Sequence, residues 1–408
     1  MRFPAVLLPL ADRDFRLLWM GRTMSSLGNH VSSVALPFQM LALGASPLQL
    51  GLAVGIQTAA SVGLLLLGGA AADRLPRRAV IRATDLAGAG VLGSVMVLAA
   101  LGALRIEHLY VAALVLGAAG AFLSPAYNAL IADLLPVERL RAGNAVGALG
   151  RSIARIAGPT IGGLTVALYG PAAAFGLDAF TFAFSFATLL VAHPARHVVP
   201  VAASIARDIG RGLGFVFATP WLWTTLLYFL LVNIAYAGQL GVMVPLLVRD
   251  TLGGGAATFG LLSAAYGVGT VVSGLLVAGL VTARPGRWLY GFEILAALGT
   301  FAIGLLPTTP AVVVGMVVTG AALSSSTVLW QSLLQRQVPP AMLGRVSSID
   351  LFGNSLIIPV APIVAAALVT SIGAPLTFIV AGVYGLALAL IALVGSPVRG
   401  LREPIVAR

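Results

Sequence analysis

Cysteine and lysine are both absent from this chain of 408 residues, and charged side chains make up only 9% of it. The lack of cysteine excludes disulfides, thiol nucleophiles and thiolate metal sites. A soluble domain carries roughly 25% charged residues to cover its surface. Apolar residues make up 59% of this chain, and they recur in runs of about 20, the length that crosses a hydrocarbon layer. The composition therefore predicts an integral membrane protein.

Other site chemistry is missing as well. The four histidines, His30, His108, His193 and His197, are too scattered to form a metal cluster. No Walker loop, HExxH, GxSxG or pair of catalytic carboxylates occurs, which argues against an ATP-driven protein and against an enzyme. The net charge of +11 is spread over short loops rather than gathered in a basic stripe, which argues against nucleic acid. We expect no catalytic residue, metal, cofactor or nucleic-acid partner.

Apolar runs separated by charged, proline or glycine residues predict twelve membrane helices. The first six cover about 17–43, 48–72, 79–101, 108–131, 146–169 and 172–192. The second six cover about 222–247, 258–281, 287–306, 310–333, 346–370 and 375–395. The predicted fold class is an all-α membrane protein.

The arginines indicate how the chain is oriented. With both termini in the cytoplasm, twenty arginines lie on the cytoplasmic side and only Arg105 and Arg249 on the other. The apolar stretch 3–10 is short and is followed at once by the charged residues Asp12, Arg13, Asp14 and Arg16, so we expect no cleavable signal peptide, and the first helix directs insertion. The expected product is a multi-pass protein of the cell membrane.

The two halves repeat each other at a nearly fixed offset, as in many transporters. Landmarks 203 to 209 residues apart are Pro37 and Pro245, Gly51 and Gly260, Pro76 and Pro285, Arg78 and Arg287, Pro136 and Pro339, Pro159 and Pro362, and Gly170 and Gly373. The repeat predicts two pseudo-symmetric six-helix bundles, at 1–192 and 221–408.

The segment 193–220 between the bundles is more polar. Its apolar residues Ile205, Ile209, Leu213 and Phe217 recur every four positions, which predicts an amphipathic helix on the cytoplasmic membrane surface. An ordinary solvated linker is the alternative.

The loop after the second predicted helix carries a motif made of Gly69, Asp73, Arg74, Pro76, Arg77 and Arg78. It resembles the G-x-x-x-D-R-x-G-R-R signature of the major facilitator superfamily, with Pro76 in place of the second glycine. The resemblance implies a gate, in which the aspartate lies near the N-terminus of helix eleven and the arginines pair with nearby acids. Asp133, at the end of helix four, is a candidate partner. The alternative is that the arginines only orient the chain.

Helix five contains Gly158, Pro159, Gly162 and Gly163. The segment resembles the G-x-x-x-G-P-x-x-G-G motif of the superfamily's exporters, with Ala154 in place of its first glycine. Proline bends a membrane helix and glycines admit a neighbouring helix, so we expect a hinge or a tight seam. Packing without any bearing on transport direction is the alternative.

Charges inside membrane helices are costly and therefore candidates for function. Asp178 is the first choice for binding a coupling proton, and a permanently paired structural charge is the alternative. Further candidates for proton coupling are Arg151, Arg155, His30 and Asp85. Because Asp85, Glu293 and Asp350 lie within about seven residues of a cytoplasmic helix end, or roughly 10 Å, we expect their side chains to reach the interface and join the gate.

In the superfamily, helices one, four, seven and ten line a central cavity. The resemblance makes polar residues on these and adjoining helices candidates for contact with a solute: Asn29, Gln39, Gln57, Tyr127, Asn128, Asn233, Tyr236, Gln239, Tyr266, Trp330 and Gln331. Amides and aromatic rings with few charges suit a bulky, partly apolar solute. Hydrogen bonds between helices are the alternative for each residue.

Within the superfamily, the segments FRLLWMGRTMSSLGNHVSSVALPFQML, SPAYNALIADLLP and LDAFTFAFSF resemble the bacterial exporters of macrolides, other drugs and siderophores. The resemblance covers the whole chain and implies alternating access, with inward proton flow driving an amphiphilic solute out of a monomeric antiporter. A nutrient importer or facilitator of the same fold is the alternative. A membrane scaffold without transport activity is a third hypothesis.

Overall fold

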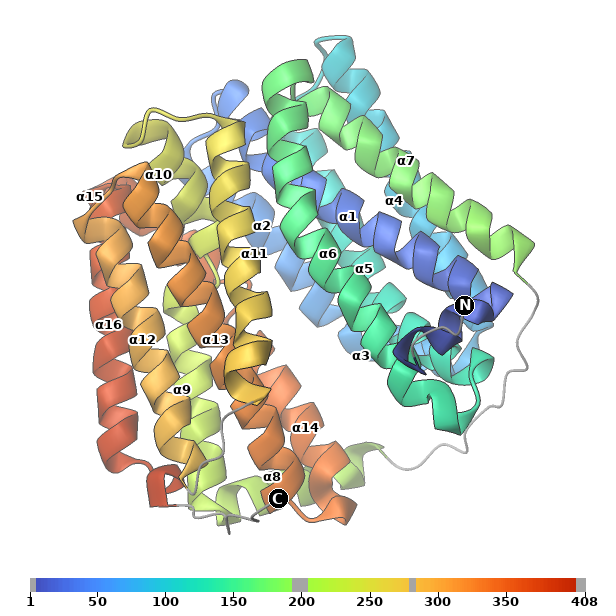
Figure 1. Cartoon of the computed structure of the whole chain (residues 1–408). Coiled ribbons are helices and arrows are strands. Elements are labelled where there is room, and N and C mark those ends of the chain that lie inside the picture. Colours follow the sequence, from blue (N-terminus) through green and yellow to red (C-terminus); the bar gives the residue numbers. More distant parts are fainter. Residues whose placement is uncertain (1–4, 193–204, 279–283, 401–408) are drawn as a thin grey trace. The chain divides into compact units, whose positions relative to one another are not determined.

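The computed structural model describes residues 5–192, 205–278 and 284–400, and every regular element in these ranges is helical (Figure 1). The chain divides into two compact units. The first contains Met1–Val201 and Gly254–Ala264, and the second contains Ala202–Gly253 and Ala265–Arg408. The predicted domain boundaries stay a prediction, and residues 193–204 of the predicted linker lie outside the described residues.

The first unit begins with a short 3₁₀ helix, η1 (Ala5–Ala11). Its helices are α1 (Arg13–Ala42), α2 (Pro47–Gly63), α3 (Leu65–Arg74), α4 (Arg77–Ala100), α5 (Ile106–Leu134), α6 (Val137–Tyr169) and α7 (Pro171–Val191). Local sequence explains where they start. Asp12 accepts a hydrogen bond from the backbone N–H of Phe15 at 2.9 Å, and Ser46 and Gln49 form a capping box before α2.

The second unit contains α8 (Ile205–Ala218), α9 (Pro220–Tyr236), the π-helical turn η2 (Gln239–Met243), α10 (Val244–Asp250), most of α11 (Ala256–Ala278), α12 (Pro285–Leu305), α13 (Thr309–Gln337), α14 (Pro340–Ser355), α15 (Ala361–Ile372), α16 (Ala374–Gly395) and the 3₁₀ helix η3 (Pro397–Gly400). The helix predicted in the linker is present as α8, and it packs against α14 (Figure 1). Whether it lies on a membrane surface stays a prediction.

Twelve spans result when the broken helices are joined. Within the described residues, eight helices are long and apolar enough to cross a membrane, and the pair α2 and α3, bent by 44° at Leu64, makes a ninth. The remaining three are α1 and α6, which are long but less apolar, and α14 with α15, which are separate helices joined by residues 356–360. The predicted fold class is confirmed.

The turn into the last helix of each bundle shows the repeat in the backbone. Gly170 and Gly373 each end one helix and begin the next, with φ and ψ of 81° and 168° and of 80° and 162°. Positive φ is the region that favours glycine. The two landmarks therefore have the same conformation in the two units.

Two helix assignments from the sequence need correction. The helix predicted from residue 146 begins at Val137, because Pro136 and Glu138 provide a start although the first turns are charged. The helix predicted over 346–370 is broken between α14 and α15. Hydropathy locates the stretch that crosses the membrane, but the helix itself can extend beyond that stretch or break within it.

Candidate functional site

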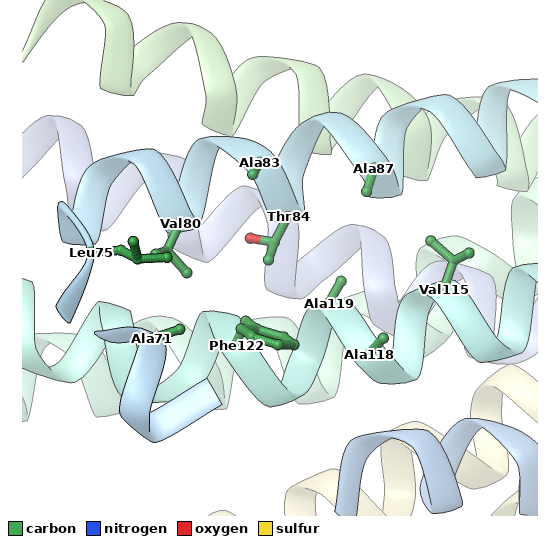
Figure 2. Close-up of a pocket in the computed structure, with 10 residues that line it drawn as sticks. All are labelled: Ala71, Leu75, Val80, Ala83, Thr84, Ala87, Val115, Ala118, Ala119 and Phe122. Carbon is green, nitrogen blue, oxygen red and sulfur yellow. The ribbon is translucent and has the colours of Figure 1, made fainter. Parts of the chain in front are cut away.

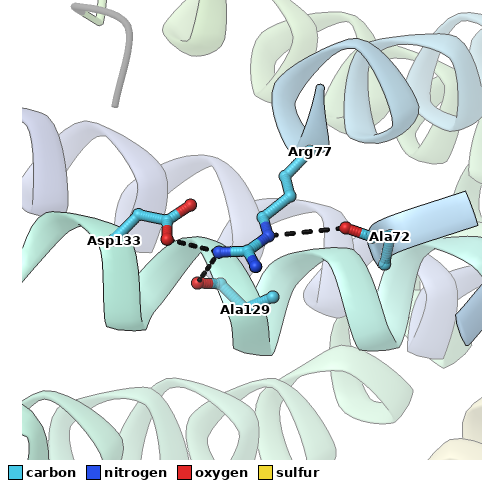
Figure 3. Close-up of polar contacts among 4 residues, drawn as sticks. All are labelled: Ala72, Arg77, Ala129 and Asp133. Atoms are coloured by element: carbon cyan, nitrogen blue, oxygen red, sulfur yellow. Dashed lines mark hydrogen bonds and ion pairs between the residues drawn. The ribbon is translucent and has the colours of Figure 1, made fainter. Parts of the chain in front are cut away.

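The loop between α3 and α4 contains an ion pair. Arg77, at the start of α4, pairs with Asp133 near the end of α5 and also donates hydrogen bonds to the backbone carbonyls of Ala129 at 3.0 Å and Ala72 at 3.4 Å (Figure 3). The side chains of Arg77 and Asp133 are only 11% and 14% exposed. The arginine therefore ties α3, α4 and α5 together at one end of the bundle, and the contact expected between Asp133 and an arginine of the motif is present.

The other residues of the motif face different ways. Arg78 donates to the carbonyl of Ala192, just after α7, at 2.7 Å, so neighbouring arginines hold opposite sides of α4. Asp73 and Arg74 are exposed, and a methyl group added at Gly69 would meet open space. The part these residues take in a gate stays a prediction.

The glycines of α6 form a seam with α1. A side chain at Gly158 would collide with His30 and the carbonyl of Leu27, and one at Gly162 would collide with the backbone of Val31. Gly163 faces Gly260, which belongs to the same compact unit. These close approaches form the expected tight seam. The helix runs without a break through Pro159, and a hinge at this point stays a prediction.

Charged and polar side chains from five helices lie near one another in the first unit, with the exposed Arg151 at the edge of the group. We call Arg22 of α1, Asp85 of α4, Tyr127 of α5, Arg151 of α6 and Ser185 of α7 the N-bundle cluster. Ser185 donates a hydrogen bond of 2.7 Å to Asp85, whose side chain is fully buried. The guanidinium of Arg22 lies 5.6 Å from the centre of the Tyr127 ring.

Arg22 supplies the positive charge next to Asp85, although the two are not in ion-pair contact. The positive charge of Arg151 lies within electrostatic reach of Arg22 and Tyr127 rather than of Asp85. Asp85 has one oxygen, and Arg22 one terminal nitrogen, that are buried without a hydrogen-bond partner among the described residues. This cluster therefore holds opposite charges whose hydrogen bonds are incomplete.

Asp178 lies in the seam between α7 and α1 and is also fully buried. One of its oxygens accepts a hydrogen bond of 3.1 Å from Thr181 and lies against Gly28. Ser32 is close to the same carboxyl group but outside hydrogen-bond geometry. The described structure shows no ion pair between Asp178 and Arg155, so the acid has hydroxyl neighbours only.

His30 and Arg155 are placed differently from the acids. The ring Nδ1 of His30 is 2.8 Å from the carbonyl of Ser26, and the positive charge of Arg155 lies within electrostatic reach of the ring. Arg151 and Arg155 are exposed on α6. Of the five candidates for proton coupling, only Asp85 and Asp178 are carboxyl groups enclosed by the bundle.

The second unit encloses two more acids. Glu293 of α12 is 2% exposed and accepts a hydrogen bond of 2.9 Å from the hydroxyl of Tyr228. Asp350 of α14 accepts hydrogen bonds from the indole N–H of Trp330 at 3.0 Å and from the amide of Asn354 at 2.7 Å. Asp85, Glu293 and Asp350 are all buried within their bundles, and the part expected of them in the gate stays a prediction.

The candidates for solute contact divide by burial. Tyr127, Gln239 and Trp330 are buried, and Gln239 donates a hydrogen bond of 3.1 Å to Thr300. Asn233 donates to the carbonyl of Asn354 at 3.3 Å. Residues with partial exposure are Gln39, Gln57, Asn233, Tyr236 and Tyr266, and exposed residues are Asn29, Asn128 and Gln331. Contacts between helices therefore account for Gln239, Trp330 and Asn233, and solute contact by the others stays a prediction.

A groove of about 370 Å³ lies among α3, α4 and α5 (Figure 2). Leu75, Val80, Val115 and Phe122 form its walls together with alanines, and the hydroxyl of its one polar residue, Thr84, is already bonded to the carbonyl of Ile81. The groove offers no free polar group to orient a solute. It suits a hydrocarbon chain and is not a site for the amphiphilic solute predicted above.

Known proteins identify the family of this chain. The sequence matches the family described as "Transmembrane secretion effector" over residues 5–403. It is 31% identical over 348 residues to the enterobactin exporter EntS of Shigella flexneri, a match that covers 82% of this chain and 80% of the relative. The corresponding exporter of Escherichia coli O139:H28 is 32% identical over the same length. This chain belongs to the transmembrane secretion effector family of the major facilitator superfamily.

Solved structures agree on the fold. A bacterial homologue of the human lysosomal transporter Spinster, in an inward-facing and unoccupied conformation, superposes with a TM-score of 0.78 at 14% identity and covers 99% of this chain and 100% of its own. The peptide transporter POT gives 0.78 at 14% identity and covers 95% of both chains. The protein is thus a multi-span membrane transporter of the major facilitator fold, and the family and its relatives are transporters rather than enzymes.

Sequence reasoning missed several partners of the buried acids. Arg22, Ser185 and Tyr228 are not among the predicted site residues, because pairs such as Asp85 and Ser185 lie 100 positions apart. Hydropathy and short motifs report only neighbours along the chain. The one signal in the sequence was Arg22, a charged residue within the first predicted membrane helix, because such a residue needs a partner.

Proposed function

We propose that this transporter exports a bulky, amphiphilic organic solute of the siderophore, macrolide or drug class, driven by protons moving inward across the cell membrane. Its similarity to enterobactin exporters over 348 residues supports export of an organic solute of this kind. Both termini lie in the cytoplasm in this proposal, and the two bundles rock about a central solute site. The transporter acts as a monomer.

The observation that carries the proton coupling is the pair of enclosed carboxyl groups in the first unit. Asp178 has hydroxyl neighbours only, and Asp85 faces Arg22 without forming an ion pair. An ionised carboxylate away from water costs much free energy unless it is paired, so each acid gains from a proton. Asp178, which lacks a facing cation, is the proposed coupling site.

The test measures uptake into inverted membrane vesicles with an acidic interior, using catecholate siderophores and fluorescent amphiphiles. Wild-type protein should accumulate at least one compound only while the proton gradient exists, and Asp178→Asn should abolish the gradient-driven part. Asp250→Asn removes an exposed acid and should transport normally. Gradient-driven uptake that persists in Asp178→Asn would move the coupling to another acid. Uptake that is independent of the gradient would support a facilitator.

A further inference from the structure

In the second unit, one buried acid has no part in the function proposed above. Glu293 occupies the same place in its bundle as Asp85 does in the first. Asp85 is the ninth residue of α4, and Glu293 is the ninth residue of α12. The offset of 208 between them is within one residue of the 209 that relates Pro76 to Pro285. Both acids therefore belong to the same turn of equivalent helices.

The groups that surround the two acids differ in charge. Asp85 faces Arg22, which comes from the first helix of its bundle. The first helix of the second bundle also supplies the group facing Glu293, but this group is the hydroxyl of Tyr228, at 2.9 Å. The group that α9 places against Glu293 is thus a neutral hydroxyl, whereas the group that α1 places near Asp85 is a cation.

The remaining neighbours of Glu293 are hydroxyls too. On α9, Tyr236 lies within electrostatic reach, and its hydroxyl is buried without a partner. On α12 itself, Tyr290 bonds to Thr225 at 3.1 Å and packs against the ring of Tyr228. On α13, Ser326 is close to the carboxyl group but outside hydrogen-bond geometry. No arginine, histidine or further acid acts on Glu293 among the described residues, including those of α16.

The chemistry of these partners decides what can neutralise the acid. A hydroxyl can accept as well as donate a hydrogen bond, whereas an indole or amide N–H can only donate. Asp350 accepts from two N–H donors, and these donors stabilise its ionised form. Glu293 can instead carry a proton, accept from Tyr228 on one oxygen and donate from the other to Ser326, whose oxygen has no partner.

We propose that Glu293 is a proton-binding site of the second bundle, in which an exchangeable proton takes the place that Arg22 has beside Asp85 in the first. A bare carboxylate at 2% exposure with no facing cation is strongly unfavourable, and a proton removes that charge. This inference deepens the proposed transport function and rests on it for its role in the cycle. The binding of the proton itself does not require any solute.

The test uses the purified full-length transporter in lipid and records infrared difference spectra between about pH 5 and about pH 9, a range in which exposed aspartate stays ionised. A protonated carboxyl group has a C=O stretching band that disappears on ionisation. Wild-type protein should show such a band with pH-dependent amplitude. Glu293→Gln should lose one component of it, and Asp250→Asn, at an exposed acid, should leave the spectrum unchanged.

Tyr228→Phe provides a second variant that keeps the acid. Removing the hydroxyl that donates to Glu293 should shift its band to higher frequency without loss of amplitude, because the C=O group loses a hydrogen bond. Identical difference spectra for wild type and Glu293→Gln would overturn the proposal, as would a Glu293 band that does not change with pH. Since no solute is present, these results are independent of whether the vesicle experiment supports export.

Discussion

Two ion pairs among the described residues differ in how much water reaches them. Arg77 and Asp133 are 11% and 14% exposed and come from different helices. Arg249 and Asp250 are neighbours in sequence and are 40% and 45% exposed. Water and salt screen the second pair, whereas removing one partner of the first leaves a charge in a poorly solvated place.

We predict that Asp133→Ala lowers the stability of the purified protein by roughly 1–3 kcal/mol, because Arg77 then keeps only its carbonyl acceptors. Asp250→Ala should cost at most about 0.5 kcal/mol. Denaturation of Asp133→Ala, Arg77→Ala and the variant with both changes in detergent completes a double-mutant cycle, and Asp250→Ala is measured beside them as the exposed comparison. Equal losses for Asp133→Ala and Asp250→Ala would show that the pair in the loop motif does not hold the bundle together.

At the scale of residues, the sequence predicted positions better than partners. Gly69, Asp73, Arg74, Arg77 and Arg78 form a contiguous motif, and its charge pattern is visible without a structure. The enclosure of Asp85 and Glu293 was not visible, because depth along a helix says nothing about which side faces the bundle. The periodic pattern that would show this is weak where small and apolar residues surround the helix on all sides.

Small residues determine how closely the membrane helices pack. Gly158 and Gly162 of α6 lie against the backbone of α1, whereas Gly69 of α3 faces open space. Close approach increases the van der Waals contact that drives helix association in lipid, where the hydrophobic effect between helices is absent.

We predict that Gly162→Ala lowers stability by about 1–3 kcal/mol, since an added methyl group must separate α6 from the backbone of Val31. Gly69→Ala should be neutral or stabilising by up to about 1 kcal/mol, because alanine is the better helix former. Thermal unfolding of the two variants in the same detergent gives the comparison. If Gly69→Ala were the more damaging change, the seam would not limit the packing.

At the scale of elements, the helix boundaries show which ends can be predicted from the sequence and which cannot. Proline and glycine marked most ends correctly, as at Pro171 and Gly373. The bend at Leu64 was not predicted, because no proline lies there and apolar residues run through it. The break after Ser355 contains Pro359, but the apolar residues around this proline were interpreted as one continuous helix. Contacts with neighbouring helices decide such breaks, and a single sequence does not report them.

At the scale of the whole molecule, the fold class followed from composition, the repeat and the loop motif. Twelve runs, a duplication and one signature are independent observations that agree, which is why the sequence alone could predict the fold class. The orientation of the chain rests on arginine counting alone, and the absence of cysteine makes it easy to test.

We predict that Leu101→Cys reacts with a membrane-impermeant maleimide in intact cells, because the turn between α4 and α5 lies outside in the proposed orientation. Val137→Cys, at the start of α6, should react only after permeabilisation. Both side chains are well exposed, at 74% and 78%, so access to the reagent differs only by the side of the membrane. The reverse pattern would place the termini outside.

Proton-coupled export is the central claim, and the direction of proton movement tests it most directly. Purified protein is reconstituted into liposomes that contain a pH indicator, without an imposed gradient, and an enterobactin-like catecholate is added outside. Exchange of solute for protons predicts that the interior becomes more alkaline as solute enters, and that Asp178→Asn removes this change. Acidification of the interior would mean co-transport and contradict the account, and solute uptake with no change in pH would contradict coupling altogether.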